Sequence, residues 1–270
     1  MVECSLCQGE KVLLSQRGDL AHVRRCECQS PCPVCGDEGY FYETDEFGYR
    51  NAVPCTCQVL ERRVKSFNDA GIPNRYLDAN FGRINAGSNA QDMAVARQKA
   101  WRFAREFEPG VQGLLFYGST GTGKTYLTIA ILRYLILSRG VRARFCEFMH
   151  LLSALRASYG DRGKAEDFMG PLVEVPLLVI DELGKGRGTD WELSVLDELI
   201  SKRYNAQRTT IFTTNYGIEG PGAPSGEEPV AEEPLLDRVG VRIHSRLMEM
   251  CEAVRLTGYD YRREMGQRSR

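Results

Sequence analysis

The chain has 270 residues, 43% of them hydrophobic and 26% charged, and its formal net charge is −1 at pH 7. That length suits one large domain with a small one, and the near-neutral balance excludes a chain drawn to nucleic acid or membrane by bulk charge alone. No apolar run approaches the roughly 18 residues of a membrane span and the N-terminus lacks an apolar signal core, so we expect a soluble cytoplasmic protein without membrane contact.

Eight of the ten cysteines lie in the first 57 residues, as four close pairs. The spacing C-x₂-C-x₁₈-C-x-C is followed by C-x₂-C-x₁₉-C-x-C, which indicates an internal duplication with a period of about 28 residues. Each spacer is typical of a β-hairpin. Because Zn²⁺ takes four ligands in a tetrahedron, residues 1–60 are predicted to hold two structural Zn²⁺ ions. The eight expected ligands are Cys4, Cys7, Cys26, Cys28, Cys32, Cys35, Cys55 and Cys57.

The pairing of these cysteines leaves alternatives open. Tandem pairing, with the first four on one ion and the last four on the other, is favoured over a crossed pairing that groups Cys26, Cys28, Cys32 and Cys35. His22 offers a possible substitute ligand, degenerate sites without metal are a further reading, and a disulfide framework does not suit a cytosolic chain. In the sequence of residues 1–60, basic residues also alternate with aromatic ones. This pattern suits binding of single-stranded DNA, and it is equally typical of a solvated hairpin surface. The residues are Arg17, Arg24, Arg25 and Arg50, with Tyr40, Phe41, Tyr42 and Tyr49.

Residues 61–85 are predicted to be a linker, with a short helix that ends before Pro73, and residues 86–265 a large second domain. A helix is expected over 91–107 from its apolar spacing. Apolar runs then alternate with helical patterns, which predicts a parallel sheet with helices on both faces. The expected strands are 113–117, 141–148, 176–181, 209–214 and 253–257.

The segment after the first of these strands fits the phosphate-loop pattern G-x-x-x-x-G-K-[ST] and precedes a helical run. Backbone N–H groups of such a loop and the N-terminus of the following helix attract a polyphosphate. Lys124 is expected to reach the β- and γ-phosphates of ATP, and the Thr125 hydroxyl to bind Mg²⁺. The expected nucleotide-binding residues are Gly118, Ser119, Thr120, Gly121, Thr122, Gly123, Lys124 and Thr125.

Acidic and amide side chains follow two later strands. Asp181 and Glu182 end the apolar run 177–180, so Asp181 is predicted to hold Mg²⁺ and Glu182 to activate water for attack on the γ-phosphate. Asn215 ends the next strand, where it either contacts the γ-phosphate and its attacking water or merely forms a turn. Arg246, preceded on the same helix face by Arg242, and Arg262 are candidates for stabilising the charge of phosphoryl transfer.

Taken together, these motifs resemble the DnaC/DnaI/IstB group of AAA+ ATPases, bacterial helicase loaders and transposition helpers. The resemblance is carried by G-I-P-x-R-Y at 71–76, GSTGTGKTYL at 118–127, LVIDELG at 178–184, TTN at 213–215, R-I-x-S-R-L at 242–247 and a final Tyr-Arg. It implies an α/β fold with a five-stranded AAA+ core, Mg-dependent ATP hydrolysis and ATP-dependent homo-oligomers with shared sites. It also implies that Asn215 is sensor 1, Arg246 an arginine finger acting in trans, and Arg262 sensor 2.

Two features depart from this group: the duplicated cysteine unit and an acidic Pro/Gly-rich insert at 217–234, expected to be a surface loop. The resemblance implies a role in DNA replication, with the replicative helicase and single-stranded DNA as partners. A transposition helper that serves a transposase is the alternative within the group. An alternative from another class is a zinc-based adaptor with a static nucleotide site.

Overall fold

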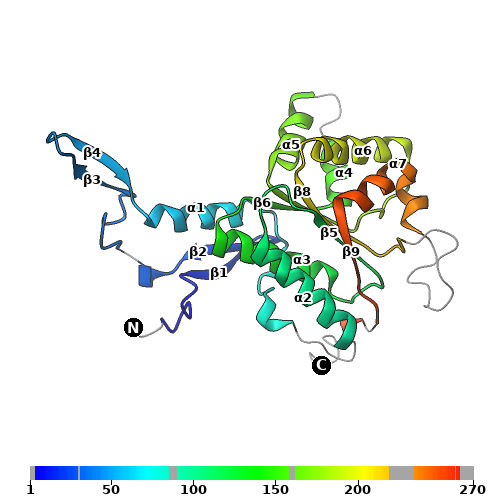
Figure 1. Ribbon diagram of the computed structural model, residues 1–270, viewed down its shortest axis with the longest axis horizontal. Coiled ribbons are helices and arrows are strands. Elements are labelled where there is room, and N and C mark those ends of the chain that lie inside the picture. The colour runs from blue at the N-terminus through cyan, green and yellow to red at the C-terminus, as the bar shows by residue number, and fades with distance from the viewer. Residues whose placement is uncertain are drawn as a thin grey trace. The chain divides into compact units, whose positions relative to one another are not determined.

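The computed structural model describes residues 4–29, 31–84, 90–157, 162–218, 234–258 and 260–261. The chain forms two compact units, one of residues 1–78 with 133–142 and one of residues 79–132 with 143–270. Figure 1 shows the elements of both. None of the helices within these described ranges is long and apolar enough to cross a membrane.

The first unit contains two antiparallel hairpins, one inside each cysteine repeat (Figure 1). They are β1 (Val12–Arg17) with β2 (Leu20–Arg25), and β3 (Tyr40–Thr44) with β4 (Arg50–Pro54). Helix α1 (Cys57–Asn68) follows the second repeat, and 3₁₀ turns lie at Glu27–Gln29 and Asn74–Tyr76. The hairpins that the spacers predicted are therefore present.

Helix α1 packs mainly against the first hairpin, through β2. Its Phe67 is buried, and the Asn68 side chain pairs with the backbone of Val23, accepting from its N–H at 2.8 Å and donating to its carbonyl at 3.0 Å. The Ala21 N–H donates to the Ile72 carbonyl at 2.8 Å. Residues 57–74 thus cover the first hairpin with a helix and then an extended segment.

The second unit is built on five parallel strands in the order β6-β7-β8-β5-β9, which confirms the predicted five-stranded parallel sheet. The strands are β5 (Gly113–Tyr117), β6 (Ala143–Glu147), β7 (Leu177–Asp181), β8 (Thr209–Thr214) and β9 (Cys251–Arg255). Every residue of β5, β7 and β8 is buried, which explains why β5 and β7 are largely continuous apolar runs rather than alternating ones, while β8 buries four threonines beside Ile211 and Phe212. The edge strand β9 begins two residues earlier than the run 253–257 predicts.

Helices cover both faces of this sheet (Figure 1). They are α2 (Ala90–Glu106), α3 (Lys124–Arg139), α4 (Phe148–Ala157), α5 (Arg162–Glu174), α6 (Asp190–Asn205) and α7 (Leu235–Met250), with a 3₁₀ turn at Phe81–Arg83. Apolar side chains of α4 to α7 form one core with those of β5, β7 and β8, including Leu115, Ile180 and Phe212. The layers place the carboxyl ends of all five strands along one edge, where a ligand of such a sheet binds.

Two local features shape α6 and α7, a cap at the start of α6 and a break inside α7. Thr189 caps α6 in a reciprocal capping box with Glu192, whose buried carboxylate also pairs with Arg156 at 2.8 Å. The path of α7 breaks at Gly240, which has a φ of 78°. The part of α7 after this break carries Arg242 and Arg246. This part corresponds to the helix predicted over 239–250.

Candidate nucleotide site and metal centres

The phosphate loop joins β5 to α3, and its glycines are required by close approaches of other backbone and side-chain atoms. A Cβ on Gly118, which has a φ of 134°, would lie 1.9 Å from the Leu256 carbonyl oxygen. A Cβ on Gly121 would lie 1.8 Å from Asp260 Oδ1. The segment after β9 therefore lies against the loop, and the positive φ together with the backbone contact requires glycine at position 118, while the φ of 80° favours glycine at position 121.

Lys124 is buried at the start of α3, with 6% of the residue exposed. Its Nζ donates to the carbonyl oxygens of Gly118 at 2.8 Å and Ser119 at 2.7 Å. The ammonium is thus held by the loop itself, at the N-terminus of a helix that adds its own positive end. A buried cation in this position is suited to a phosphate.

Three oxygen-bearing side chains meet where β7 and β8 end. Asp181 Oδ1 accepts from the Thr125 hydroxyl at 2.9 Å and from the Thr213 hydroxyl at 2.5 Å. Burial raises the pKa of Asp181, while these two hydroxyl groups oppose that rise. A hydroxyl and a carboxylate side by side provide the hard oxygen ligands that Mg²⁺ prefers, so Thr125 and Asp181 fit the predicted metal role.

The sequence pattern assigns no role to Thr213, although it belongs to the Thr-Thr-Asn motif at 213–215. Its hydroxyl orients Asp181 and also accepts from the Glu182 N–H at 3.0 Å. Only the pairing of β7 with β8 brings these residues, 32 positions apart in sequence, into contact.

Glu182 follows β7 directly and has a left-handed backbone, with a φ of 57°. Such a conformation is strained for a non-glycine residue and is often found at functional sites. Its Oε2 accepts from Lys185 Nζ at 2.5 Å, and this contact raises the pKa of Lys185. The carboxylate predicted to activate water is therefore paired with a cation three residues later, a contact that the sequence analysis did not anticipate.

Asn215 is half-buried just beyond β8, which lies between β5 and β7 in the sheet. The sheet order therefore places Asn215 between the phosphate loop and Asp181.

The segment before Arg262 reaches the phosphate loop, because the Tyr261 N–H donates to the Gly121 carbonyl at 3.1 Å. Arg262 itself lies outside the described residues.

Arg242 and Arg246 lie on one face of α7, as predicted, and both approach Asp197 of α6. Arg246 donates to Asp197 Oδ1 at 2.8 Å and to the Ser201 hydroxyl at 2.5 Å, and 20% of its side chain is exposed. Arg242 is 3.6 Å from Asp197 Oδ2 with 72% of its side chain exposed. Arg246 is thus held in a fixed position at the surface of α6 and α7.

The eight N-terminal cysteine sulfurs gather into two sets of four, in the tandem arrangement rather than the crossed one. Within each set, all Sγ atoms lie within 4.8 Å of one another. The separations include 3.8 Å for Cys4–Cys26 and 3.7 Å for Cys32–Cys55. A ZnS₄ tetrahedron with bonds of roughly 2.3 Å needs sulfurs about 3.8 Å apart, so both sets fit Zn²⁺.

In each set of four cysteines, a backbone N–H group lowers the pKa of one thiol. The Cys7 N–H lowers the pKa of the Cys4 thiol to about 7, and the Cys35 N–H does the same for Cys32. The Gly39 N–H donates to Cys35 Sγ at 3.3 Å. These N–H groups favour the thiolates of Cys4 and Cys32, the form that binds metal, whereas the neighbouring thiol of Cys35 raises the pKa of Cys57 to about 12.

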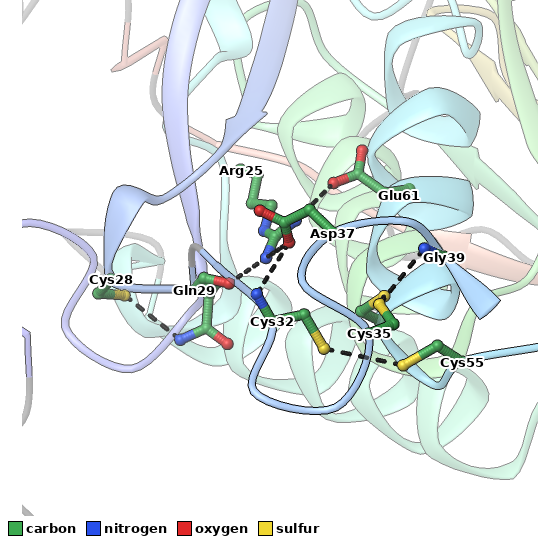
Figure 2. Close-up of polar contacts among 10 residues, drawn as sticks. Arg25, Cys28, Gln29, Cys32, Cys35, Asp37, Gly39, Cys55 and Glu61 are labelled. Carbon is green, nitrogen blue, oxygen red and sulfur yellow. Dashed lines mark hydrogen bonds and ion pairs between the residues drawn. The ribbon is translucent and has the colours of Figure 1, made fainter. Parts of the chain in front are cut away.

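Arg25 joins the two cysteine repeats (Figure 2). It pairs with Asp37 at 2.7 Å and with Glu61 at 3.5 Å, and it donates to the Gln29 carbonyl. Asp37 in turn accepts from the Cys32 N–H at 3.0 Å. This guanidinium is therefore committed to holding the repeats together.

Three of the four basic residues of the front end lie on a different hairpin from the aromatic residues. Arg17, Arg24 and Arg25 belong to the first hairpin, whereas the aromatic residues belong to the second. Arg50, whose guanidinium carbon lies 4.8 Å from the Tyr42 ring centre, is on the second hairpin.

Of the insert at 217–234, only its ends at 217–218 and 234 are described, and a parallel bridge joins Gly217 to Pro234.

Comparison with known proteins identifies relatives of this arrangement. The family model of the IstB-like ATP binding protein matches residues 88–269. The replicative helicase loader DnaC of Escherichia coli K12 is 28% identical over 200 residues, covering 74% of this chain and 78% of DnaC. A crystal structure of the DnaC helicase loader superposes with a TM-score of 0.58 at 30% identity, covering 68% of this chain and 99% of the other. A crystal structure of DnaI has a TM-score of 0.54 at 24% identity, covering 70% of this chain and 93% of the other.

Proposed function

The chain belongs to the IstB-like family of ATP-binding proteins, and from that premise we propose that it is a helicase-loader-like ATPase acting in DNA replication. The proposal is carried by one observation, the meeting of Thr125, Asp181 and Thr213 beside a phosphate loop that holds Lys124. A loop that binds phosphate and an oxygen cluster that suits Mg²⁺ together form a site for a nucleoside triphosphate. The similarity to DnaC supports the replicative helicase as partner.

In the proposed mechanism, the loop N–H groups and Lys124 bind the phosphates of ATP. Thr125 and Asp181 would hold Mg²⁺, which neutralises charge on the phosphates when bound. Glu182 accepts a proton from the attacking water, and Asn215 orients that water.

We assign the completion of the site to a neighbouring protomer. Arg246 would enter the site of the next subunit and stabilise the negative charge of the transition state, with Arg262 of the same chain acting as sensor 2. The fixed, partly exposed position of Arg246 supports this role, since an arginine held by Asp197 and Ser201 reaches a partner with little loss of side-chain entropy. ATP binding would then favour a homo-oligomer.

The two cysteine sets are proposed to be structural Zn²⁺ sites. Neither hairpin has a large apolar core, so metal binding should supply much of the folding free energy of residues 1–56. Single-stranded DNA remains a proposed partner of the ATPase unit.

A transposition helper is the second candidate, because the matching family model is that of IstB-like proteins. Binding assays separate the two candidates. The purified chain with ATP should bind the replicative helicase of its own organism and not a transposase from the same genome. Binding to the transposase alone would reverse the assignment. A chain with no ATP turnover in any condition would instead be the static adaptor.

A further inference from the structure

Arg238 lies in the first turn of α7 and contacts the segment that follows the carboxylate predicted to activate water. Its Nε donates to the Gly184 carbonyl at 3.1 Å, and its Nη2 donates to the Gly186 carbonyl. Its guanidinium carbon lies 5.2 Å from the ring centre of Tyr216, the residue after Asn215. Arg238 therefore contacts both segments that carry residues assigned to the attacking water, one after β7 and one after β8.

The segment after β7 is a tight turn over residues 182–186. The Lys185 N–H donates to the Glu182 carbonyl at 3.1 Å, and the Gly186 N–H donates to the Gly184 carbonyl at 2.9 Å. The two carbonyls that the arginine binds belong to this turn, one on each side of Lys185. The arginine thus holds the backbone of the turn, whereas the Lys185 ammonium contacts the Glu182 carboxylate itself.

The backbone of Glu182 needs restraints, because its φ of 57° is unfavourable for a residue with a side chain. Such a conformation persists only where the surrounding structure holds it. On the side of β8, the Glu182 N–H donates to the Thr213 hydroxyl at 3.0 Å, and the Leu183 N–H donates to the Thr213 carbonyl at 2.8 Å. On the side of α7, Arg238 holds the next part of the turn through its two carbonyl contacts.

An arginine is suited to this position because its donors are fixed in one plane. Two of them serve two carbonyls at once while the guanidinium lies over the Tyr216 ring. Hydrogen bonds from a charged donor are also roughly twice as strong as those between neutral groups. Arg238 therefore restrains the turn more firmly than a neutral donor would.

We propose that Arg238 is a positioning residue for Glu182. It holds the turn over residues 182–186, so that the Glu182 carboxylate stays where it can accept a proton from the attacking water. This inference rests on the proposed function, in which Glu182 is that acceptor. Since Arg238 acts through the backbone of the turn, its effect on hydrolysis should depend on the presence of the carboxylate.

The experiment is a double-mutant cycle on the full-length chain with ATP and Mg²⁺, measured as the single-turnover rate of phosphate release. Arg238→Met should lower this rate at least tenfold, since a misplacement on the order of 1 Å can cost about 100-fold. The affinity for ATP should stay at the wild-type value. In the Glu182→Gln chain, the same change should alter the rate less than twofold, because no carboxylate is left to position.

Arg187→Met is the matched control. It removes an exposed guanidinium directly after the same turn and should hydrolyse ATP within twofold of the wild-type rate. If Arg238→Met no longer binds ATP, Arg238→Lys takes its place in the same cycle, because a lysine keeps the charge but lacks the planar pair of donors.

The other outcomes overturn the inference in distinguishable ways. If the Arg238 variant lowers the rate equally with Glu182 and with Gln at position 182, the arginine supports the fold alone and the inference is wrong. A wild-type rate for the Arg238 variant also overturns it, while the proposed function stands. A wild-type chain without ATP turnover removes the proposed function and the inference together.

Discussion

The ion pair between Lys185 and Glu182 should restrain ATP hydrolysis, and its removal should accelerate turnover. A carboxylate whose Oε2 lies 2.5 Å from an ammonium must give up that contact before it accepts a proton from water. In Lys185→Met the carboxylate is released while the length of the side chain is nearly kept. Lys185→Arg retains the charge and serves as the matched control.

The size of this effect follows from exposure. The Lys185 side chain is 58% exposed and that of Glu182 is 19% exposed, so the pair is partly screened by solvent. Pairs of this kind contribute about 0.2–1 kcal/mol. If the wild type must spend this free energy to break the pair before the chemical step, Lys185→Met avoids the cost and its turnover number rises by up to about fivefold. The KM for ATP should not change, because neither residue belongs to the phosphate loop.

Steady-state phosphate release at saturating ATP measures this prediction, and single-turnover rates show whether the chemical step has changed. Lys185→Arg should behave as wild type. A turnover number for Lys185→Met below that of wild type, with the KM for ATP unchanged, would refute the reasoning. It would mean that Lys185 assists the reaction.

Three further predictions concern the site and the metal centres. Glu182→Gln should bind ATP normally and hydrolyse it about 100-fold more slowly, because the amide cannot accept the proton; near-normal phosphate release would contradict the assignment. Thr213→Val should raise the Mg²⁺ concentration needed for half-maximal turnover, since Asp181 loses its 2.5 Å hydrogen bond, and an unchanged Mg²⁺ titration would count against that role. The purified chain should contain about two zinc ions, and a strong chelator should unfold residues 1–56 without abolishing ATP binding. Metal content near zero with intact hairpin signals in a circular dichroism spectrum would exclude structural zinc.

The parts of this molecule that sequence reasoning predicts well are set by local patterns. The phosphate loop has a fixed spacing of glycines, and β5 and β7 are largely apolar because both of their faces are buried. The cysteine spacing likewise gives two hairpins and, in the structure, two sets of four sulfurs. Each signal lies within a few residues of the feature that it predicts.

The contacts that sequence reasoning misses depend on tertiary arrangement. Thr213 reaches Asp181 only because β7 and β8 are neighbours, and α1 covers β2 rather than the nearer β4. The identity of a residue does not say which strands lie side by side. The basic and aromatic residues of the front end therefore suggest one surface in the sequence, although most of them lie on different hairpins in the structure. Lys185 also looks like an ordinary loop residue until its 2.5 Å contact with Glu182 is seen.

The central claim is that ATP bound at one protomer is hydrolysed with the help of Arg246 from its neighbour. The most direct test mixes two inactive variants, Lys124→Ala and Arg246→Ala, and measures phosphate release. In mixed oligomers, the intact phosphate loop of the Arg246→Ala chain lies beside the intact arginine of the Lys124→Ala chain. We predict that activity returns to a substantial fraction of wild type on mixing. Turnover that stays at the level of either variant alone, in a mixture shown to form joint oligomers, would contradict the account.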